Sequence, residues 1–553
     1  MPLPPRSRVL ILDLGDVLFS WSPVTSTSIT PKMLKYFLSS SVWREFECGR
    51  LSEDECYRLV GEKFALNSGE VRQAILDARA SLQPDNSFMD FIRKLQAETE
   101  GALRIFAMSN ISAPDFAVAR GKPADWSIFE RVFTSADARM RKPDLTFFKF
   151  VLEEIKVESS SVVFVDDSIE NVLAARSLGI NGIVFDDVKR VRQALRYFVC
   201  DPVSRGQTFL EERAGRLESE NNIGENVSEN FAQLLILEAT GNRKLVNYVH
   251  HSRTWNFFRE ISILPDKFPE DLDTTSIGLT VVHPDDHVVN SVLDEMLQFV
   301  REDGITMTYF DPERLRTDPV VALNVLSLLY SRGRGHELAH TLDWVLGVLE
   351  HRAYLDGTRY YETAECFLFF ATRLLRSTEN ASLHERLAQL LRARILERDG
   401  CSGDALALAT RVLAGAVVGL RMERELAALL SLQCEDGGWD ASWVYKFGTS
   451  GIKIGNRGLT TALALNAIAA LYPQAEDSGN TVAIAVGPPA ALEVTTALGE
   501  LTATAFPSPL TSLRPKVPKE TGGEGLSVDS VGYGVNMNLF PSNVPPSPQV
   551  IVA

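Results

Sequence analysis

The sequence contains few cysteines, no long hydrophobic run and no excess of positive charge. Only 6 of its 553 residues are cysteine and none form a C-x-x-C pair, which argues against a disulfide framework or a structural zinc site. No stretch is apolar over a transmembrane length, and residues 1–8 carry no apolar signal core. A formal net charge of −16 argues against binding to nucleic acid or to an anionic membrane. We therefore expect a soluble, cytoplasmic protein that would hold any phosphorylated ligand through a local basic pocket or a metal ion.

In the first 200 residues, polar side chains follow directly after the apolar runs that predict buried strands. Three short apolar runs end at such residues: 8–12 at Asp13, 103–108 at Ser109, and 161–165 at Asp166 and Asp167. Lys142 lies between the second and third runs, just before a helix-like stretch. Because ligand sites of open α/β sheets lie at the carboxyl ends of the strands, we expect these side chains to gather there.

The order of these motifs resembles that of the haloacid dehalogenase-like (HAD) hydrolases, and the resemblance covers residues 7–200. It implies an α/β, Rossmann-like phosphatase domain at residues 1–200, with a helical cap inserted at about residues 20–100. One position departs from the family pattern. The family carries a second acid two residues after the first, and this acid protonates the leaving group and activates water. Gly15 occupies that position here. A slow phosphatase and a HAD fold without activity are both open.

The resemblance also implies a role for each polar residue at the strand ends. Asp13 would be the nucleophile that takes a phosphoryl group in a covalent step. Ser109 would hydrogen-bond the phosphoryl oxygens, and Lys142 would offset their charge. Mg²⁺, a hard cation that prefers oxygen ligands, would be held by Asp13, the Gly15 carbonyl, and Asp166 or Asp167.

A different pattern begins near residue 228. Helix-like segments repeat without alternating strand runs, which predicts an all-α domain of antiparallel helices at residues 228–472. The polar stretch 201–227 is expected to be an exposed linker. Residues 473–553 are rich in Pro, Gly, Ser and Thr, which predicts a loosely ordered tail.

Two motifs in the helical half carry a second resemblance. Residues 271–275 (D-L-D-T-T) resemble the D-x-D-D-T acid motif of class II terpene cyclases, in the D-x-D-T-T form of drimane-type sesquiterpene synthases. Residues 433–439 (Q-C-E-D-G-G-W) fit the Q-x-x-x-G-x-W repeat of these cyclases, whose Gln and Trp tie neighbouring helices together. The two motifs imply an α/α barrel of the terpene cyclase β type. A HAD domain followed by one barrel resembles the drimane and albicanyl diphosphate synthases of fungi and bacteria.

Cyclisation by protonation needs a strong, well-aimed acid, because an alkene is a poor base. The resemblance implies Asp273 as the proton donor and Asp271 as a residue that orients it or binds a neighbour. Burial raises the pKa of a carboxyl and keeps its neutral form populated. Thr274 stands where another acid is usual, and we expect its hydroxyl to hydrogen-bond Asp273. Without the resemblance, these residues would be interpreted as an ordinary helix N-cap.

A cyclising cation needs an apolar cavity, since aromatic faces stabilise positive charge and water would quench it. The aromatic candidates are Trp255, Phe257, Phe258, Tyr360, Tyr361, Phe367, Trp443, Tyr445 and Phe447. The basic candidates for binding a diphosphate are Arg314, Arg316, Lys446, Lys453 and Arg457, although residues 446–457 also fit a solvated loop. Residues 336–340 match the H-E-x-x-H zinc motif, but they start a helix and lack a third ligand, which argues against a metalloprotease.

Together these motifs predict a bifunctional sesquiterpene synthase. Asp273 would protonate the terminal alkene of farnesyl diphosphate, two rings would close, and proton loss would give a bicyclic drimane-type diphosphate. The barrel carries no D-D-x-x-D metal motif, as expected if the diphosphate is not ionised to start the reaction. The HAD domain, with Mg²⁺, would then release a monophosphate or an alcohol such as drimenol or albicanol.

Two alternatives stay open at this level. In the first, the cyclase releases the diphosphate and the HAD domain is inactive. In the second, the protein is a plain HAD phosphatase whose helical half is a binding or dimerisation module. The sequence also leaves the oligomeric state open, with a homodimer among the options.

Overall fold

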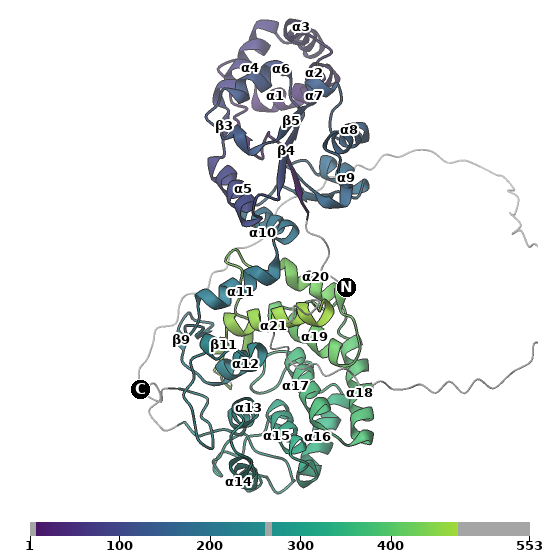
Figure 1. The fold of residues 1–553 in the computed structure, drawn as a ribbon. Coiled ribbons are helices and arrows are strands. Elements are labelled where there is room, and N and C mark those ends of the chain that lie inside the picture. Colours follow the sequence, from purple (N-terminus) through teal and green to yellow (C-terminus); the bar gives the residue numbers. More distant parts are fainter. Residues whose placement is uncertain (1–6, 260–267, 449, 474–553) are drawn as a thin grey trace, which may run out of the picture. The chain divides into compact units, whose positions relative to one another are not determined.

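The computed structural model describes residues 7–259, 268–448 and 450–473. The expected tail lies outside the described residues from residue 474 onward. Within the described ranges the chain forms an α/β domain followed by a helical domain, which confirms the expected fold class (Figure 1). None of the helices in these ranges is both long and apolar enough to cross a membrane.

The α/β domain is built on a parallel sheet whose strand order is β5-β4-β1-β6-β7. The strands are β1 (Val9–Leu12), β4 (Arg104–Ser109), β5 (Arg131–Thr134), β6 (Val162–Asp166) and β7 (Asn181–Val184). β1 is paired with β4 on one side and with β6 on the other. Asp13, Ser109 and Asp166 therefore meet at one edge, because the carboxyl ends of parallel strands point the same way.

The residues of β1 alternate between two apolar clusters, one on each face of the sheet. One cluster holds Leu10 and Leu12, and the other holds Val9 and Ile11. Since successive side chains of a strand point to opposite faces, an apolar run of this kind needs apolar partners on both sides. The helices that provide them are α5 (Asn86–Glu98) and α10 (Val188–Val199) in the first cluster, and α8 (Leu145–Ile155) and α9 (Ile169–Ser177) in the second.

Between β1 and β4 the chain forms a helical cap with a core of its own. Its helices are α1 (Pro31–Leu38), α2 (Ser41–Glu47), α3 (Glu53–Phe64) and α4 (Ser68–Ser81). Each begins after a residue whose side chain accepts a hydrogen bond from the first turn, which stabilises a helix start. The cap is shorter than the expected residues 20–100, because α5 packs Phe88 and Phe91 on the sheet instead. The antiparallel pair β2 (Phe19–Ser20) and β3 (Gln83–Pro84) flanks the cap in the chain.

The helical domain contains a closed ring of helices. Neighbours pack in the order α12, α13, α15, α17, α19 and α21, and α21 packs back on α12. Their bounds are Phe231–Thr240, Leu272–Val282, Pro319–Ser331, Ala364–Ser377, Ala405–Val417 and Arg457–Leu471. The residues of α15 from Val320 to Leu329 are all buried, as expected for a helix surrounded by protein on every side.

A second layer of helices packs outside this ring. It includes α11 (Pro202–Glu212), α16 (Ala339–Glu350), α18 (Ala381–Leu396) and α20 (Glu423–Ser431). α18 buries Leu383, Leu387, Leu391 and Ile395, about one residue per turn, so it is apolar on one stripe only. The two layers form the α/α barrel expected from the acid motif and the Q-x-x-x-G-x-W repeat. A further helix, α14 (Asp286–Met296), follows α13 in the chain.

The stretch 201–227 differs from the expected exposed linker. It contains α11, which buries Phe209 and Leu210 in the core of the barrel domain. The polar residues on the outer face of this helix dominate its composition and hid the buried face from sequence reasoning. The domain also carries a small antiparallel sheet that the sequence did not predict, since its strands are too short to show alternation: β10 (Trp443–Lys446), β11 (Lys453–Gly455), β8 (Ser219–Asn221) and β9 (Asn226–Val227).

Candidate active sites

The first site lies at the carboxyl ends of β1 and β6 and is centred on Lys142. Its Nζ lies 2.9 Å from Asp13 Oδ1 and 2.6 Å from Asp166 Oδ2, and all three side chains are buried. The Leu14 N–H donates to Asp13 Oδ1 over 2.7 Å, which helps to orient the carboxylate. Burial raises the pKa of Asp13 to about 7, in opposition to the neighbouring Lys142 ammonium.

Three carboxyl groups converge beside this lysine. One oxygen from each of Asp13, Asp166 and Asp167 lies within 4.8 Å of the others. Asp166 Oδ1 accepts hydrogen bonds from the Ser168 N–H at 2.9 Å and from Asn171 Nδ2 at 2.8 Å, so its orientation is set. Burial, followed by the charge of Asp166, raises the pKa of Asp167. Clustered carboxylates of this kind are ligands for a hard divalent cation, and these residues therefore fit Mg²⁺.

Two polar residues at the end of β4 complete the site. Ser109 is the last residue of β4 and is buried. Asn110, which was not among the predicted site residues, accepts a 2.8 Å hydrogen bond from the Lys142 N–H and donates a 2.9 Å bond to the Lys142 carbonyl. It therefore holds the loop that carries the lysine. Its position directly after Ser109, at a strand end, was the signal that could have identified it.

Gly15 has room for a larger residue. A Cβ atom added there would meet no heavy atom within 4 Å. Its φ also lies outside the positive range that favours glycine. Neither space nor backbone conformation requires a glycine at this position. The missing carboxyl group is therefore a chemical property of the site and not a consequence of packing.

The second site is built at the start of α13, in the ring of the barrel. Asp271 is the N-cap of this helix, and its Oδ1 accepts a 2.6 Å hydrogen bond from the Thr274 N–H. The Asp271 N–H in turn donates to the Trp255 carbonyl over 3.1 Å. The cap places Asp273 in the first turn, buried with its neighbours. An N-cap and an acid motif therefore coexist in the same residues.

Two donors from other parts of the barrel hold Asp273. Tyr361 donates its hydroxyl to Oδ2 over 2.5 Å, and Asn324 donates its amide to Oδ1 over 2.7 Å. Burial raises the pKa of Asp273 to about 7, while these two hydrogen bonds oppose the rise. The carboxyl can thus hold a proton near neutral pH, and its conjugate base is stabilised once the proton leaves. This combination suits an acid that must donate to a weak base.

Sequence reasoning missed both donors. Asn324 is a polar residue within the otherwise apolar stretch of α15, and a buried amide in such a helix is a recognisable signal. Tyr361 was predicted only as an aromatic residue that lines the cavity.

Burial and the nearby Asp273 raise the pKa of Asp271 to about 8, so two close carboxyls resist simultaneous ionisation.

The expected bond from the Thr274 hydroxyl to Asp273 is absent among the described residues. The residue contacts Asp271 instead, through its backbone N–H. Consecutive residues of a helix point about 100° apart, so their side chains do not face each other. Thr275 takes a structural role, since its hydroxyl oxygen accepts a 2.8 Å hydrogen bond from the Trp255 N–H.

Aromatic side chains gather around Tyr361. Its ring centroid lies 5.3 Å from that of Tyr445 and 5.3 Å from that of Phe370, and Tyr445 also contacts Phe231 and Phe257. Phe231 and Phe370 were not predicted. Two predicted residues lie apart from this group. Trp255 packs on Gly278 of α13, where an added Cβ would lie 2.6 Å from the indole, and Phe367 stacks on Tyr354.

Cations adjoin a second pair of aromatic residues in the same domain. Tyr309 and Tyr360 are joined through their hydroxyls at 3.1 Å. The Arg359 guanidinium lies over the Tyr360 ring, and the Arg314 guanidinium, which pairs with Asp311 at 3.1 Å, lies over the Tyr309 ring. Lys446 contacts this pair only through its backbone N–H, which donates to the Tyr360 carbonyl. Arg359 was not predicted, and its buried Nε has no hydrogen-bond partner among the described residues.

The other predicted cations have different environments. Lys453 forms an ion pair with Glu362 at 2.5 Å, and the Lys446 ammonium lies 3.8 Å from the same carboxylate. Arg316 is exposed. Arg457 forms a two-pronged ion pair with Asp436 at 2.9 Å, which assigns it to the scaffold.

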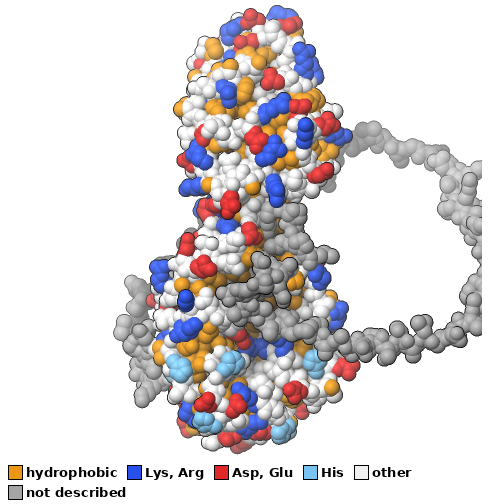
Figure 2. Space-filling view, in the orientation of Figure 1, with side chains coloured by type: hydrophobic (Ala, Val, Ile, Leu, Met, Phe, Trp, Pro, Cys, Tyr) orange, Lys and Arg blue, Asp and Glu red, His pale blue; other side chains and the backbone are white. Residues whose placement is uncertain are grey.

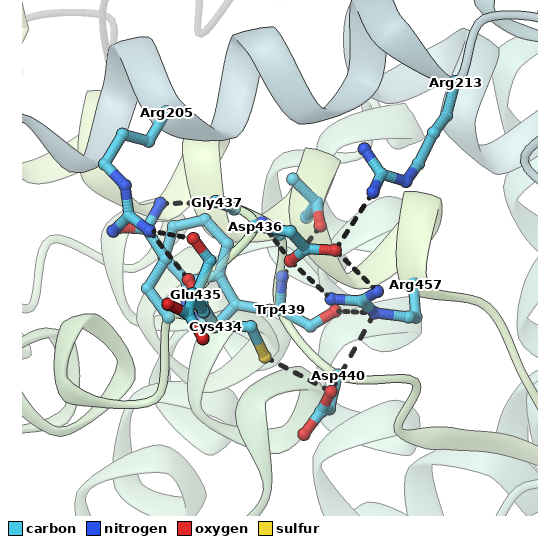
Figure 3. A network of polar contacts seen from close by, with 12 residues as sticks. Arg205, Arg213, Cys434, Glu435, Asp436, Gly437, Trp439, Asp440 and Arg457 are labelled. Atoms are coloured by element: carbon cyan, nitrogen blue, oxygen red, sulfur yellow. Dashed lines mark hydrogen bonds and ion pairs between the residues drawn. The ribbon is translucent and has the colours of Figure 1, made fainter. Parts of the chain in front are cut away.

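The Q-x-x-x-G-x-W repeat joins two helices of the outer layer, and Figure 3 shows its Trp439 near Arg205 and Arg457. Gln433 Nε2 donates to the Pro202 carbonyl at 2.9 Å, and Arg205 donates to Gln433 Oε1 at the same distance. The fully buried Trp439 donates its indole N–H to the Leu429 carbonyl of α20 over 2.8 Å. The motif therefore ties α11 and α20 together, as the resemblance implied.

The H-E-x-x-H motif does not form a metal site. His336 lies in a 3-10 turn and His340 lies in α16, while Glu337 pairs with Arg334 at 2.7 Å. Within the described ranges, the group of side chains that could hold a metal ion is that of Asp13, Asp166 and Asp167. Pale-blue histidines appear scattered over one face of the helical domain in Figure 2.

Comparisons with known proteins match both halves of the chain. Residues 11–179 match the haloacid dehalogenase-like hydrolase family, and residues 203–332 match the sesquiterpene cyclase astC-like C-terminal domain family. The chain is 45% identical over 462 residues to drimenol cyclase drtB of Aspergillus calidoustus, covering 83% of this chain and 88% of the relative. It is 34% identical over 192 residues to sesquiterpene phosphatase astK of Aspergillus oryzae, covering 35% of this chain and 96% of that relative. Among solved structures, a type II terpene cyclase from Scytonema is 14% identical with a TM-score of 0.39, and the match covers 51% of this chain and 99% of that chain.

Proposed function

We propose that this protein, which belongs to the family of fused HAD and terpene cyclase enzymes that includes drimenol cyclase, converts farnesyl diphosphate to drimenol in two stages. The first stage is a cyclisation started by protonation at Asp273. The second is the removal of phosphate at Asp13. The observation that carries the proposal is the buried Asp273 carboxyl, held by two donors beside an aromatic cluster.

In the cyclisation, protonated Asp273 gives its proton to the terminal alkene of the substrate. The resulting cation is attacked by the next alkenes in turn, two rings close, and loss of a ring proton leaves a bicyclic diphosphate. Tyr361 and Asn324 stabilise the carboxylate that remains on Asp273. The neighbouring aromatic rings lower the energy of the cation and exclude water from it.

The diphosphate needs cations that are free or whose present partner it can replace. We propose that it lies near the Tyr309–Tyr360 pair, where the guanidinium groups of Arg359 and Arg314 lie over the rings, and that it replaces Asp311 as the partner of Arg314. Planar guanidinium groups bind phosphate oxygens in a two-pronged manner and suit this role. Lys446 and Lys453, which share Glu362, and the exposed Arg316 would then act from further away, and Arg457 would serve the barrel scaffold alone.

In the second stage, one Asp13 oxygen attacks phosphorus and the bond from phosphorus to the leaving oxygen breaks. Water then hydrolyses the phospho-aspartate, and repetition of both steps converts a diphosphate to a monophosphate and then to the alcohol. Ser109 donates a hydrogen bond to the transferred group, and Lys142 offsets its charge. Mg²⁺ held by Asp13, the Gly15 carbonyl, Asp166 and Asp167 would supply further positive charge at the phosphoryl oxygens.

Product analysis tests the whole proposal. Purified full-length protein is incubated with farnesyl diphosphate and Mg²⁺, and the mixture is extracted once directly and once after added phosphatase. Drimenol in the direct extract is the expected result. Drimenol that appears only after added phosphatase would leave the cyclase standing and reject the phosphatase stage. Farnesol in both extracts would reject the cyclase.

Removing the Tyr361 hydroxyl tests the support of the acid. Tyr361→Phe should lower the cyclisation rate about 10- to 100-fold, because a hydrogen bond to a charged group contributes about 1.5–3 kcal/mol. The bond also lowers the pKa of Asp273, so its loss raises that pKa. Since protonated Asp273 is the active form, the decline of activity with rising pH will then begin at a higher pH. The readout is the pH profile of product formation.

The matched control is Tyr354→Phe, which removes a hydroxyl from another buried tyrosine that stacks on Phe367. Its rate and its pH profile should stay close to those of the unaltered protein. Equal rates and profiles for the two variants would count against the role of Tyr361.

Restoring an acid at Gly15 tests the phosphatase. Gly15→Asp should raise the rate of phosphate release from an alkyl phosphate about 10²-fold, because a positioned general acid typically contributes 10²- to 10⁴-fold. The space beside Gly15 accommodates the new side chain. Gly15→Asn is the control of equal size without the acidic proton. An equal response of the two variants would show that general acid catalysis at this position is not the limit.

A further inference from the structure

A partly buried ion pair joins the cap to the loop that carries Lys142. Glu47 is the last residue of α2, and its Oε2 lies 3.1 Å from Arg141 Nη2. The side chains are only 13% and 21% exposed, respectively. Arg141 directly precedes Lys142, which contacts the nucleophile Asp13. Arg141 therefore lies in the same loop as the central lysine of the phosphatase site.

Ser135 fixes the position of this pair relative to the sheet. It is the first residue of α7 (Ser135–Ala138), which follows β5. Its hydroxyl donates to the Glu47 carbonyl at 2.7 Å and accepts a 2.9 Å bond from the Ile111 N–H, just after Asn110. The end of α2 therefore contacts the loops that follow β4 and β5. These loops leave the sheet at the same edge as Asp13.

The charge of a diphosphate exceeds what the central lysine can offset. Lys142 already contacts two carboxylates, Asp13 and Asp166. One phosphate of the substrate lies at the nucleophile Asp13. The second phosphate is bonded to the first and carries its own negative charge. An arginine is the preferred residue for such a group, because its planar fork binds two phosphate oxygens at once.

Arg141 has a carboxylate partner that can release it. Burial raises the pKa of Glu47 to about 7, against the effect of Arg141, and the charge of Asp115 adds to the rise. Another half-buried cation of the cap, Arg79, is held by both Glu53 and Asp115. Among the described residues, Arg141 has the single carboxylate partner Glu47, so an incoming anion can replace this pair at lower cost than the two pairs of Arg79.

We propose that Arg141 receives the second phosphate of a diphosphate substrate, exchanging Glu47 for it, and so sets a preference of the phosphatase site for diphosphates over monophosphates. Arg141 thus acts on specificity, while Asp13, Ser109 and Lys142 act on the transferred group. Glu47 holds the guanidinium in place between substrates. The inference deepens the proposed phosphatase function and rests on it.

Competitive inhibition measures this preference directly. Full-length protein with Mg²⁺ hydrolyses p-nitrophenyl phosphate, and inorganic pyrophosphate and inorganic phosphate serve as inhibitors. In Arg141→Gln, the inhibition constant for pyrophosphate should rise about tenfold or more, while that for phosphate changes less than about threefold, since a charge-assisted bond to the second phosphate is lost. In Glu47→Gln, which keeps the arginine and removes its competitor, the constant for pyrophosphate should fall. The control is Arg139→Gln, an exposed arginine two residues away.

The outcomes separate this inference from the function beneath it. Equal changes for pyrophosphate and phosphate in Arg141→Gln, or weaker pyrophosphate binding in Glu47→Gln, would overturn the role of Arg141 and leave the phosphatase intact. Absence of hydrolysis by the unaltered protein would instead overturn the phosphatase assignment. The opposite signs expected for the two variants also distinguish the exchange from general damage to the fold.

Discussion

Replacing Asp273 with asparagine will lower the formation of bicyclic product by at least about 10³-fold, because the reaction starts with a proton that only an acid can supply. Asparagine has nearly the same shape, but its amide carries no acidic proton. One of its two polar atoms is a donor, so either Tyr361 or Asn324 loses an acceptor as well. The variant thus removes the proton and disturbs the two bonds that stabilise its departure.

The fold should survive this change. Asp273 has a pKa of about 7 in the protein, well above its usual range, so its ionised form is not favoured by folding. A neutral side chain in its place therefore removes the cost of burying a charge. This gain offsets the loss of one hydrogen bond to Tyr361 or Asn324. We expect a change in melting temperature of only a few degrees.

The measurement is the amount of cyclised alcohol from farnesyl diphosphate after complete dephosphorylation with added phosphatase. Hydrolysis of p-nitrophenyl phosphate by the same preparation should be unchanged, because Asp13 is untouched. The matched control is Asp285→Asn, at the exposed N-cap of α14. Cyclisation by Asp273→Asn at more than a tenth of the unaltered rate would remove Asp273 from the role of acid.

Asp13→Asn will stop phosphate release and leave cyclisation intact, so the bicyclic diphosphate will accumulate. An amide is a far weaker nucleophile than a carboxylate, and no phospho-enzyme forms without it. We expect a loss of at least about 10³-fold, comparable with removal of other catalytic groups that act as a unit.

The charges around Asp13 also predict an effect on stability. Asp13 and Asp166 share the Lys142 ammonium, and burial disfavours the ionised form of Asp13. Asparagine relieves the repulsion between the two acids while Lys142 keeps its bond to Asp166. In the absence of Mg²⁺, the variant should therefore unfold at the same temperature as the unaltered protein or above it.

Mass spectrometry of the direct extract checks this second prediction, since it distinguishes the diphosphate, the monophosphate and the alcohol. Added phosphatase should recover the alcohol in the normal amount. Asp90→Asn, an exposed acid on α5, is the control. Normal release of alcohol by Asp13→Asn would assign the chemistry to another residue, and loss of the cyclised skeleton would show that the two stages are not separable.

Local patterns predicted the scaffold of both sites. The apolar run of β1 and the acid that follows it sufficed to place Asp13 at the end of a buried strand. The same reasoning located Ser109 and Asp166, because a parallel sheet brings the ends of its strands to one edge. In the barrel domain, helical periodicity predicted an all-α fold, and the resemblance of residues 271–275 and 433–439 to terpene cyclase motifs implied an α/α barrel.

Contacts between distant residues were not accessible in this way. Asn324 and Tyr361 follow Asp273 by 51 and 88 residues, respectively, and meet it only because the ring of helices closes. Tyr309 and Tyr360, which are 51 residues apart in the chain, meet for the same reason. The buried face of α11 was hidden too, since few of its residues are apolar and the barrel covers those few.

The sequence by itself thus determined the order of the two domains and their fold classes, and it predicted the acids that we propose for each reaction. The fold classes follow from short-range periodicity, and the acids follow from the resemblance of short motifs to those of known families. Only the tertiary structure decided that Tyr361 and Asn324 bond Asp273, that Tyr309 meets Tyr360, and that Glu47 pairs with Arg141, the residue before Lys142. The physical reason is that hydrogen bonds and ion pairs depend on distances of about 3 Å between side chains, and such distances across elements are set by packing and not by position along the chain.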